Sequence, residues 1–174
     1  MNVKFITRTA ILLALTIVMQ TVGRYIPLGP NSQFIVGPLV NACLLIGAAA
    51  TGIYGGAVIA LVAPFGAILT GAAIPLPFAP FIAIGNFVLV LFFYLLRKNK
   101  IAGILSGALL KFGFLFASVH VFVRMMNLPA KKADAMIASF GWSQLVTALI
   151  GGAIALAVIK ALGNNLEMPV KMKD

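Results

Sequence analysis

Acidic residues are absent from most of this chain. Residues 1–133 contain Lys, Arg and one His but no Asp or Glu, and the first carboxylate is Asp134. The 174 residues are also 62% hydrophobic, so we expect most of the chain to lie in lipid. Membrane proteins that use proton or sodium gradients generally carry intramembrane acids as relays or counter-ions. The sequence therefore argues against such an ion cycle, and any solute movement is expected to draw its energy from a partner.

Six apolar runs are candidates for membrane-spanning helices. A spanning helix needs about 20 mostly apolar residues, whereas barrel strands would be about 10 residues long with strict alternation. We therefore expect an all-α integral membrane protein, located in the cell membrane, with one domain over residues 1–174. The expected spans are Phe5–Gly23, Val36–Ala50, Ile53–Gly71, Phe78–Leu96, Ile101–Met126 and Ala135–Leu162.

The basic residues indicate a topology. The net charge is +10, and of the 13 Lys and Arg residues eight fall on the side of both termini and four on the opposite side, with Lys111 between them. The positive-inside rule then places both termini in the cytoplasm. The excess of basic residues therefore indicates the orientation of the chain in the membrane rather than nucleic-acid binding. The first apolar run has no convincing cleavage site, so we expect a span there and no signal peptide.

The connections on the two sides of the membrane differ. Those on the cytoplasmic side are short, namely Thr51-Gly52 and Arg97–Lys100. The outer connections are longer and rich in proline: Arg24–Gly37, Gly71–Pro80 and Asn127–Asp134. Long loops gathered on one face suggest that this face recognises a ligand. The alternative is that outer loops simply tolerate length.

Lys111 is the most informative polar residue. It lies about 15 Å into its span, close to the bilayer midplane, where a Lys costs about 2.5–3.5 kcal/mol. No acid lies near it in sequence. One interpretation is that its amine meets a polar or anionic ligand. The other is that a neutral Lys111 is hydrogen-bonded to the backbone or to an amide such as Asn86.

Other polar side chains surround the same region of the expected bundle. His120 and Arg124 share one helix face, and His120 lies about 180° around the helix from Lys111, so these residues cannot line one pocket with Lys111 unless the helix bends. Trp142 is interpreted either as a stacking surface for a flat ligand or as part of the interfacial aromatic belt. A few polar contacts in an apolar cavity suit one small ligand. The expected substrate-binding residues are Gln33, Asn86, Lys111, Ser118, Trp142, Ser143, Gln144 and Thr147, with Asn41 and Ser139 as further hydrogen-bonding residues.

Several kinds of chemistry are excluded by what the sequence lacks. It has no G-x-x-x-x-G-K-[ST] motif for ATP and no His, Cys and carboxylate cluster for a catalytic metal. Cys43 is the only cysteine, so no intrachain disulfide is possible. Ser118 is two positions from His120 and does not face it on a helix. We therefore expect no enzyme activity, no metal and no cofactor.

Ala10 and Ala14 form a pair of small residues one helical turn apart in the first span. Such pairs let another helix approach closely, although internal packing is the more common explanation when the pair is taken alone. With the opening T-R-T-A-I-L-L-A-L, the I-P-L-G-P loop, the P-F-I-A-I-G-N stretch and the S-Q-L-V-T-A-L-I-G-G run, the chain resembles the substrate-specific S components of energy-coupling-factor (ECF) transporters. The resemblance covers essentially the whole chain.

The resemblance implies a mechanism. It implies an outward-facing site for a micronutrient, the loop Arg24–Gly37 as a lid, and Ala10 and Ala14 as the contact to a transmembrane scaffold. That scaffold and two cytoplasmic ATPases would supply the energy. The lack of acids disfavours a cationic ligand, while Lys111 and Arg124 favour a carboxylate or phosphate, as in pantothenate, and a neutral ring compound stays open. The alternatives are a solute transporter or channel that works without partners, and a structural membrane subunit.

Overall fold

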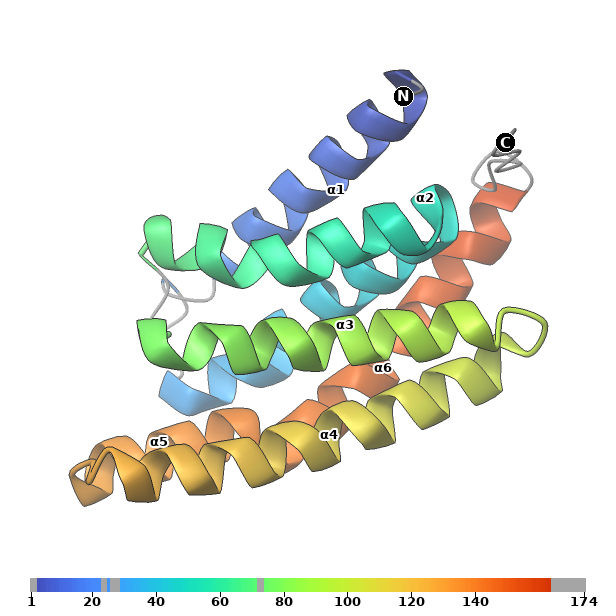
Figure 1. Ribbon diagram of the computed structural model, residues 1–174. Coiled ribbons are helices and arrows are strands. Elements are labelled where there is room, and N and C mark those ends of the chain that lie inside the picture. Colours follow the sequence, from blue (N-terminus) through green and yellow to red (C-terminus); the bar gives the residue numbers. More distant parts are fainter. Residues whose placement is uncertain (1–2, 23–24, 26–28, 72–73, 164–174) are drawn as a thin grey trace.

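The chain folds into helices packed lengthwise against one another (Figure 1). A computed structural model describes residues 3–22, 25, 29–71 and 74–163. Within these residues there is no β-strand, which confirms the expected all-α class. Five helical stretches are long and apolar enough to cross a membrane. The first, α1 (Val3–Val22), packs chiefly on the second, α2 (Gln33–Leu69).

Helix α2 is a hairpin of two helical arms. Its one residue with non-helical backbone angles is Gly52, at φ 71° and ψ −168°, a region open essentially to glycine alone. The chain reverses there, and Figure 1 shows the two arms running back along each other. A Cβ added to Gly47 would lie 2.6 Å from Ile59 Cδ1, so the arms are in direct contact. The turn expected at Thr51-Gly52 is therefore present.

The start of α2 differs from the sequence-based expectation. The loop was expected to extend to Gly37 and the span to begin at Val36, but the helix already begins at Gln33, after the short 3-10 helix η2 (Gly29–Ser32). Pro38 is accommodated inside this helix. Arg24 and residues 26–28 of the expected lid lie outside the described residues.

Helices α3 and α4 form an antiparallel pair close to the expected bounds. The short 3-10 helix η3 (Leu76–Phe78) leads into α3 (Ala79–Leu95), which is followed by α4 (Lys100–Met125). The side chain of Asn99 caps α4 by accepting a hydrogen bond from the Ala102 amide at 3.1 Å. A Cβ on Gly107 would lie 3.0 Å from the Leu89 carbonyl oxygen, so this glycine lets the two backbones approach closely.

The last expected span, Ala135–Leu162, is wrong as a single helix. The structure has α5 (Ala130–Phe140) and α6 (Trp142–Leu162), separated at Gly141, whose φ of −91° and ψ of −125° are not helical. The expected outer loop Asn127–Asp134 consequently contains the first turn of α5. This turn was not predicted from the sequence, because the lysines and Asp134 at the start of α5 are residues typical of a loop.

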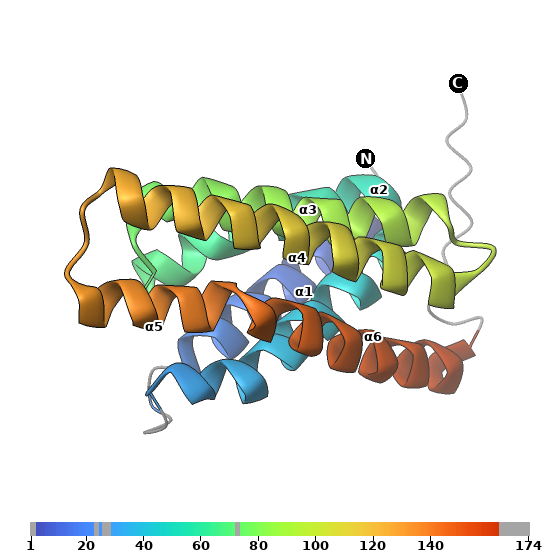
Figure 2. The ribbon, with the colours of Figure 1, turned by 90° about the horizontal axis from the view of Figure 1, so that it is seen from below.

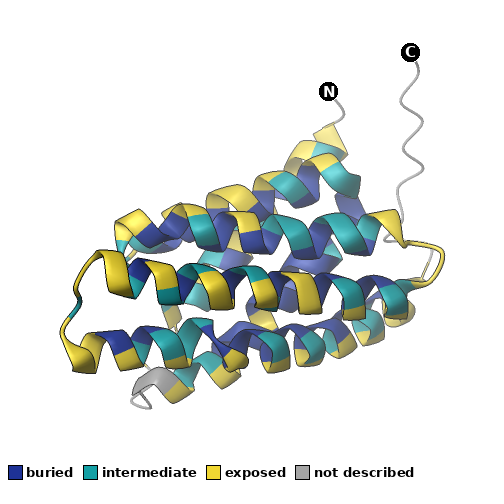
Figure 3. Cartoon of the chain, turned by 60° about the horizontal axis from the view of Figure 1, so that its bottom comes forward, coloured by how far each residue is buried: buried dark blue, intermediate teal, exposed yellow. Residues whose placement is uncertain are grey.

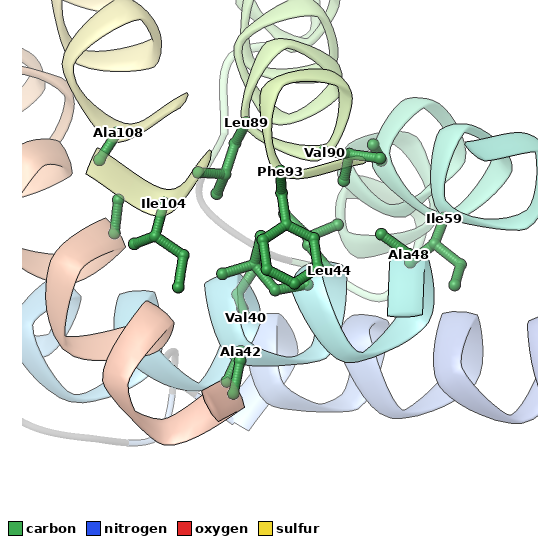
Figure 4. Packing of buried hydrophobic residues seen from close by; sticks show 14 of the residues in the cluster. Val40, Ala42, Leu44, Ala48, Ile59, Leu89, Val90, Phe93, Ile104 and Ala108 are labelled. Atoms are coloured by element: carbon green, nitrogen blue, oxygen red, sulfur yellow. The ribbon is translucent and has the colours of Figure 1, made fainter. Parts of the chain in front are cut away.

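The bundle has two distinct ends. Figures 1 and 2 show the start of α1, the Gly52 turn, the α3–α4 turn and the end of α6 at one end, which we call the Gly52 end. The opposite end, which we call the α5 end, holds the end of α4, the start of α3 and α5. The main core lies between α2, α3, α4 and α6, where Leu44, Ile59, Leu89, Phe93 and Ile104 pack together (Figure 4).

Buried residues face the inside of the bundle and exposed residues face outward (Figure 3). Many large apolar side chains are on the outer surface, for example Leu69, Leu109 and Val121. A surface of this kind is expected where the surrounding solvent is hydrocarbon. Helix α1 is the least buried of the long helices, since only Thr9 and Thr16 are fully covered.

Candidate functional site

A buried polar cluster joins three helices near the midpoints of α3, of α4 and of the first arm of α2. Lys111 of α4 donates from Nζ to Asn41 Oδ1 of α2 at 2.6 Å and to Asn86 Oδ1 of α3 at 2.8 Å. Each of these three residues is only 2% exposed. The only carboxylate among the described residues is Asp134, which is exposed on α5. Lys111 is therefore held by amide dipoles rather than by an opposite charge.

The direction of the hydrogen bonds in this cluster follows from the ammonium group. An ammonium has three donors and no acceptor, so both asparagines must turn their oxygens toward Lys111. Asn41 Nδ2 then faces Thr147 Oγ1 of α6 at 3.4 Å, and Thr147 donates to the Gln144 carbonyl oxygen at 3.3 Å. The chain of hydrogen bonds thus extends from α4 through α2 to α6.

The cluster contains more donors than acceptors. Asn86 Nδ2 is buried and has no hydrogen-bond partner. The described residues supply two acceptors for the three ammonium hydrogens of Lys111. Unpaired buried donors are costly, at about 1–3 kcal/mol each. The cluster is therefore chemically complementary to a group that only accepts hydrogen bonds, such as a carboxylate or a carbonyl oxygen.

The sequence identified two members of this cluster and missed the role of the third. Lys111 and Asn86 were expected site residues, and their direct hydrogen bond is the contact that the sequence offered as an alternative to ligand binding. Asn41 was recognised as a hydrogen-bonding residue but not as a site residue. An amide within an apolar run indicates a buried hydrogen-bonding residue. That Asn41 reaches Lys111, however, is shown only by how α2 and α4 are placed in the folded chain.

The polar residues of α6 divide into buried and exposed groups. Ser143, Gln144 and Thr147 are buried. Ser143 Oγ and Gln144 Nε2 both donate to the Ser139 carbonyl oxygen, at 2.7 and 2.9 Å, and so span the break between α5 and α6. Only Thr147 joins the Lys111 cluster directly, through Asn41.

Trp142 lies on the outside of the bundle. It is 67% exposed, and its ring is 5.0 Å from that of Phe112 on α4. Phe112 is followed by Phe116 and then by His120, each ring contacting the next. His120 is therefore on the side of α4 away from Lys111, as helix geometry predicted. This aromatic surface is separate from the buried cluster.

Ser118 and Gln33 also lie apart from the cluster. Ser118 is half-buried, and its hydroxyl donates to the Phe114 carbonyl oxygen at 2.7 Å, on the edge of an apolar groove between α3 and α4. Gln33 is half-buried at the first position of α2. The eight expected site residues therefore do not form a single pocket in the described part of the chain.

Ala10 and Ala14 are exposed on α1. Ile11, Leu15 and Val18 are exposed on the same helix, so a strip of small and apolar side chains faces outward there. Among the described residues no group of three His, Cys, Asp or Glu is placed to hold a metal ion.

The comparison with protein families identifies the class of protein. Residues 4–163 match the family described as the substrate-specific component of ECF transporters, and the chain belongs to this family. Its members are membrane-embedded transporter subunits and not enzymes. Membership implies a small-molecule substrate, an ECF scaffold and ATPases as partners. Neither the curated proteins nor the solved structures contain a match.

Proposed function

We propose that this protein captures a small micronutrient at the outer face of the membrane and delivers it through an ATPase-driven ECF scaffold. The observation that carries this proposal is the surplus of buried donors in the Lys111 cluster. A substrate with a carboxylate, such as pantothenate, would satisfy Asn86 Nδ2 and the third ammonium hydrogen together. A cationic substrate would find no opposite charge there.

The proposed topology has six spans with both termini in the cytoplasm. Each arm of α2 is about as long as a span, so the hairpin at Gly52 supplies two crossings rather than one. The Gly52 end, where α1 begins and α6 ends, is then cytoplasmic, in agreement with its excess of Lys and Arg. The α5 end faces outward.

The proposed binding site lies between the Lys111 cluster and the α5 end. Lys111 and Asn86 hold the anionic group, and Thr147, Gln144 and Ser143 supply the polar wall on α6. Gln33 lies further out, at the start of α2, and is proposed to contact the substrate on its way in, whereas Ser118 and Trp142 lie on outer surfaces of the bundle and are left out of the proposed site. The proposed lid is the part of Arg24–Gly37 that precedes α2.

The proposed coupling site is the exposed alanine pair on α1. Ala10 and Ala14 leave a shallow depression in which a scaffold helix can pack closely. Because the sequence has no P-loop and no acid before Asp134, nucleotide hydrolysis by the partner ATPases provides the energy.

The test is to purify the protein in detergent and to identify co-purified small molecules by mass spectrometry. We expect an anionic compound at close to one equivalent, and titration of that compound or of pantothenate should be saturable. Lys111→Met should abolish binding, whereas Lys160→Met, an exposed lysine on α6, should not change it. Equal binding by wild type and Lys111→Met would contradict the proposal.

A structural role for the cluster is the second candidate, because Lys111 is already held by two amides and three helices meet there. It predicts no saturable ligand for the purified chain. A transporter that needs no partner would instead accumulate solute in vesicles containing this chain alone. Reconstitution with and without the scaffold and ATPases separates these cases from the proposed function.

A further inference from the structure

An apolar groove lies on the surface of α3 and α4 at the α5 end of the bundle. Its volume is about 490 Å³. Phe81 of α3 and Phe114, Ala117, Val121, Phe122 and Met125 of α4 line it. Phe122 is buried, whereas Val121 and Met125 are more than half exposed, so the groove opens to the surroundings of the bundle. Because the chain is membrane-embedded, those surroundings are lipid.

The lining of the groove selects for hydrocarbon. Its one polar side chain is that of Ser118, whose hydroxyl already donates to the Phe114 carbonyl oxygen. A polar ligand would therefore find no donor aimed at it, and its desolvation would not be compensated. Methionine side chains are flexible and adapt to irregular apolar partners, which suits Met125 to a chain of variable conformation.

Basic residues lie at the same end of α4. Arg124 is in the last turn, next to Met125, and Lys131 and Lys132 follow at the start of α5. All three are exposed, and the side chain of Arg124 has no hydrogen bond or ion pair within the described residues. Asp134 is the only carboxylate in the described part of the chain. The apolar groove therefore ends in a zone of net positive charge.

We propose that this groove binds an anionic phospholipid, with an acyl chain along Val121 and Phe114 and the phosphate headgroup at Arg124. Apolar contact and headgroup charge are the two signals that together retain a lipid at a protein surface. The site is separate from the Lys111 cluster, and the inference rests on membrane location rather than on the proposed substrate.

The experiment compares lipid retention by native mass spectrometry. The purified chain is delipidated and titrated with phosphatidylglycerol or with phosphatidylcholine of the same acyl chains. We expect tighter binding of phosphatidylglycerol, and about fivefold weaker binding of it by Arg124→Gln, since one basic side chain near an anionic headgroup contributes about that factor. Lys160→Gln, at the opposite end, should bind both lipids as the wild type does.

Filling the groove tests the apolar half of the site. Ala117→Trp should reduce the retention of both lipids, whereas Leu109→Trp, an exposed position of α4 outside the groove, should not. Val121→Trp provides a second groove variant if Ala117→Trp does not fold, as judged by its thermal unfolding. Equal retention by groove and control variants would overturn the proposal, as would equal binding of the two lipids or crosslinking of the groove to a helix of the scaffold.

Discussion

Gly151 of α6 lies so close to Asn41 of α2 that a methyl group could not be inserted between them. A Cβ built on Gly151 would be 2.6 Å from Asn41 Cβ and 2.6 Å from the Pro38 carbonyl oxygen. Asn41 is the residue through which Lys111 is connected to α6. The contact between a glycine and an asparagine therefore fixes the distance between two helices and the position of the buried cluster.

Gly151→Ala should separate α6 from α2 and destabilise the bundle. Overpacking of this kind costs about 1–3 kcal/mol, and the displacement of Asn41 should also weaken ligand binding. Thermal unfolding in detergent measures the first effect and ligand titration the second. The matched control is Gly113→Ala on α4, where an added Cβ has nothing within 4 Å. A Gly151→Ala protein as stable as this control would show that the two helices separate at little cost.

Lys111→Met should lower stability by leaving the oxygens of Asn41 and Asn86 buried without a donor. Each unsatisfied acceptor costs about 1–3 kcal/mol. Replacing the whole cluster, as Lys111→Met with Asn41→Leu and Asn86→Leu, should recover much of that loss, because the substitutions leave no unpaired polar group at these three positions. Unfolding midpoints of the single and triple variants measure this recovery.

Ligand binding separates the structural and functional roles of the same residues. The triple variant should fold yet bind no anionic substrate, because both donors are gone. If it binds the co-purified compound with unchanged affinity, the cluster serves only to hold the helices together.

Bulky residues on the exposed face of α1 should abolish uptake without affecting ligand capture. Ala10→Trp and Ala14→Trp add volume where a scaffold helix is proposed to pack, and neither position is buried. Uptake in cells and ligand titration of the purified chain give the two readouts. Ile84→Trp, on an exposed position of α3, is the control. Loss of binding in the alanine variants would mean that the pair supports the fold instead.

Gly52→Ala should destabilise the α2 hairpin. The φ of 71° with ψ of −168° is strained for any residue with a side chain, at a cost of about 1–3 kcal/mol. Thermal unfolding relative to Gly113→Ala isolates this strain from the general effect of adding a methyl group to a helix. If Gly52→Ala and Gly113→Ala both stabilise the protein, the backbone at position 52 can adopt another conformation at no cost in stability, which would contradict this prediction.

Much of the fold could be predicted from the sequence, because a long apolar run in a bilayer has few alternatives to a spanning helix. Helices α3 and α4 begin and end within one residue of the expected bounds, where Asn99 and the neighbouring basic residues interrupt the apolar pattern. The break at Gly141 was not foreseen, since a glycine inside an apolar run is as compatible with close helix packing as with a kink. The helical turn at Ala130 was hidden by its polar composition.

The candidate site was only partly predictable, for a different reason. A lysine deep in a span demands partners, so Lys111 and its contact with Asn86 followed from the cost of burying a charge. Which other residues join them depends on how distant helices pack. Asn41 is 70 positions from Lys111, and nothing in the local pattern reports their contact. Trp142 shows the opposite case: Ser143 and Gln144 beside it on α6 are buried, while its own ring lies outside the bundle, tilted against that of Phe112.

Helix α1 packs chiefly on α2 and contributes no hydrogen bond to the Lys111 cluster within the described residues. Its tightest contacts include Ile17 against Gly66 on the second arm of α2 and the hydrogen bond from Thr21 to Thr70, the residue that follows this arm. Asn41 is on the first arm. A force on α1 would therefore reach the first arm of α2, and with it Asn41, through the side-by-side contact of the two arms, such as Ile59 against Gly47, and through Thr16, which lies against Cys43 on the first arm.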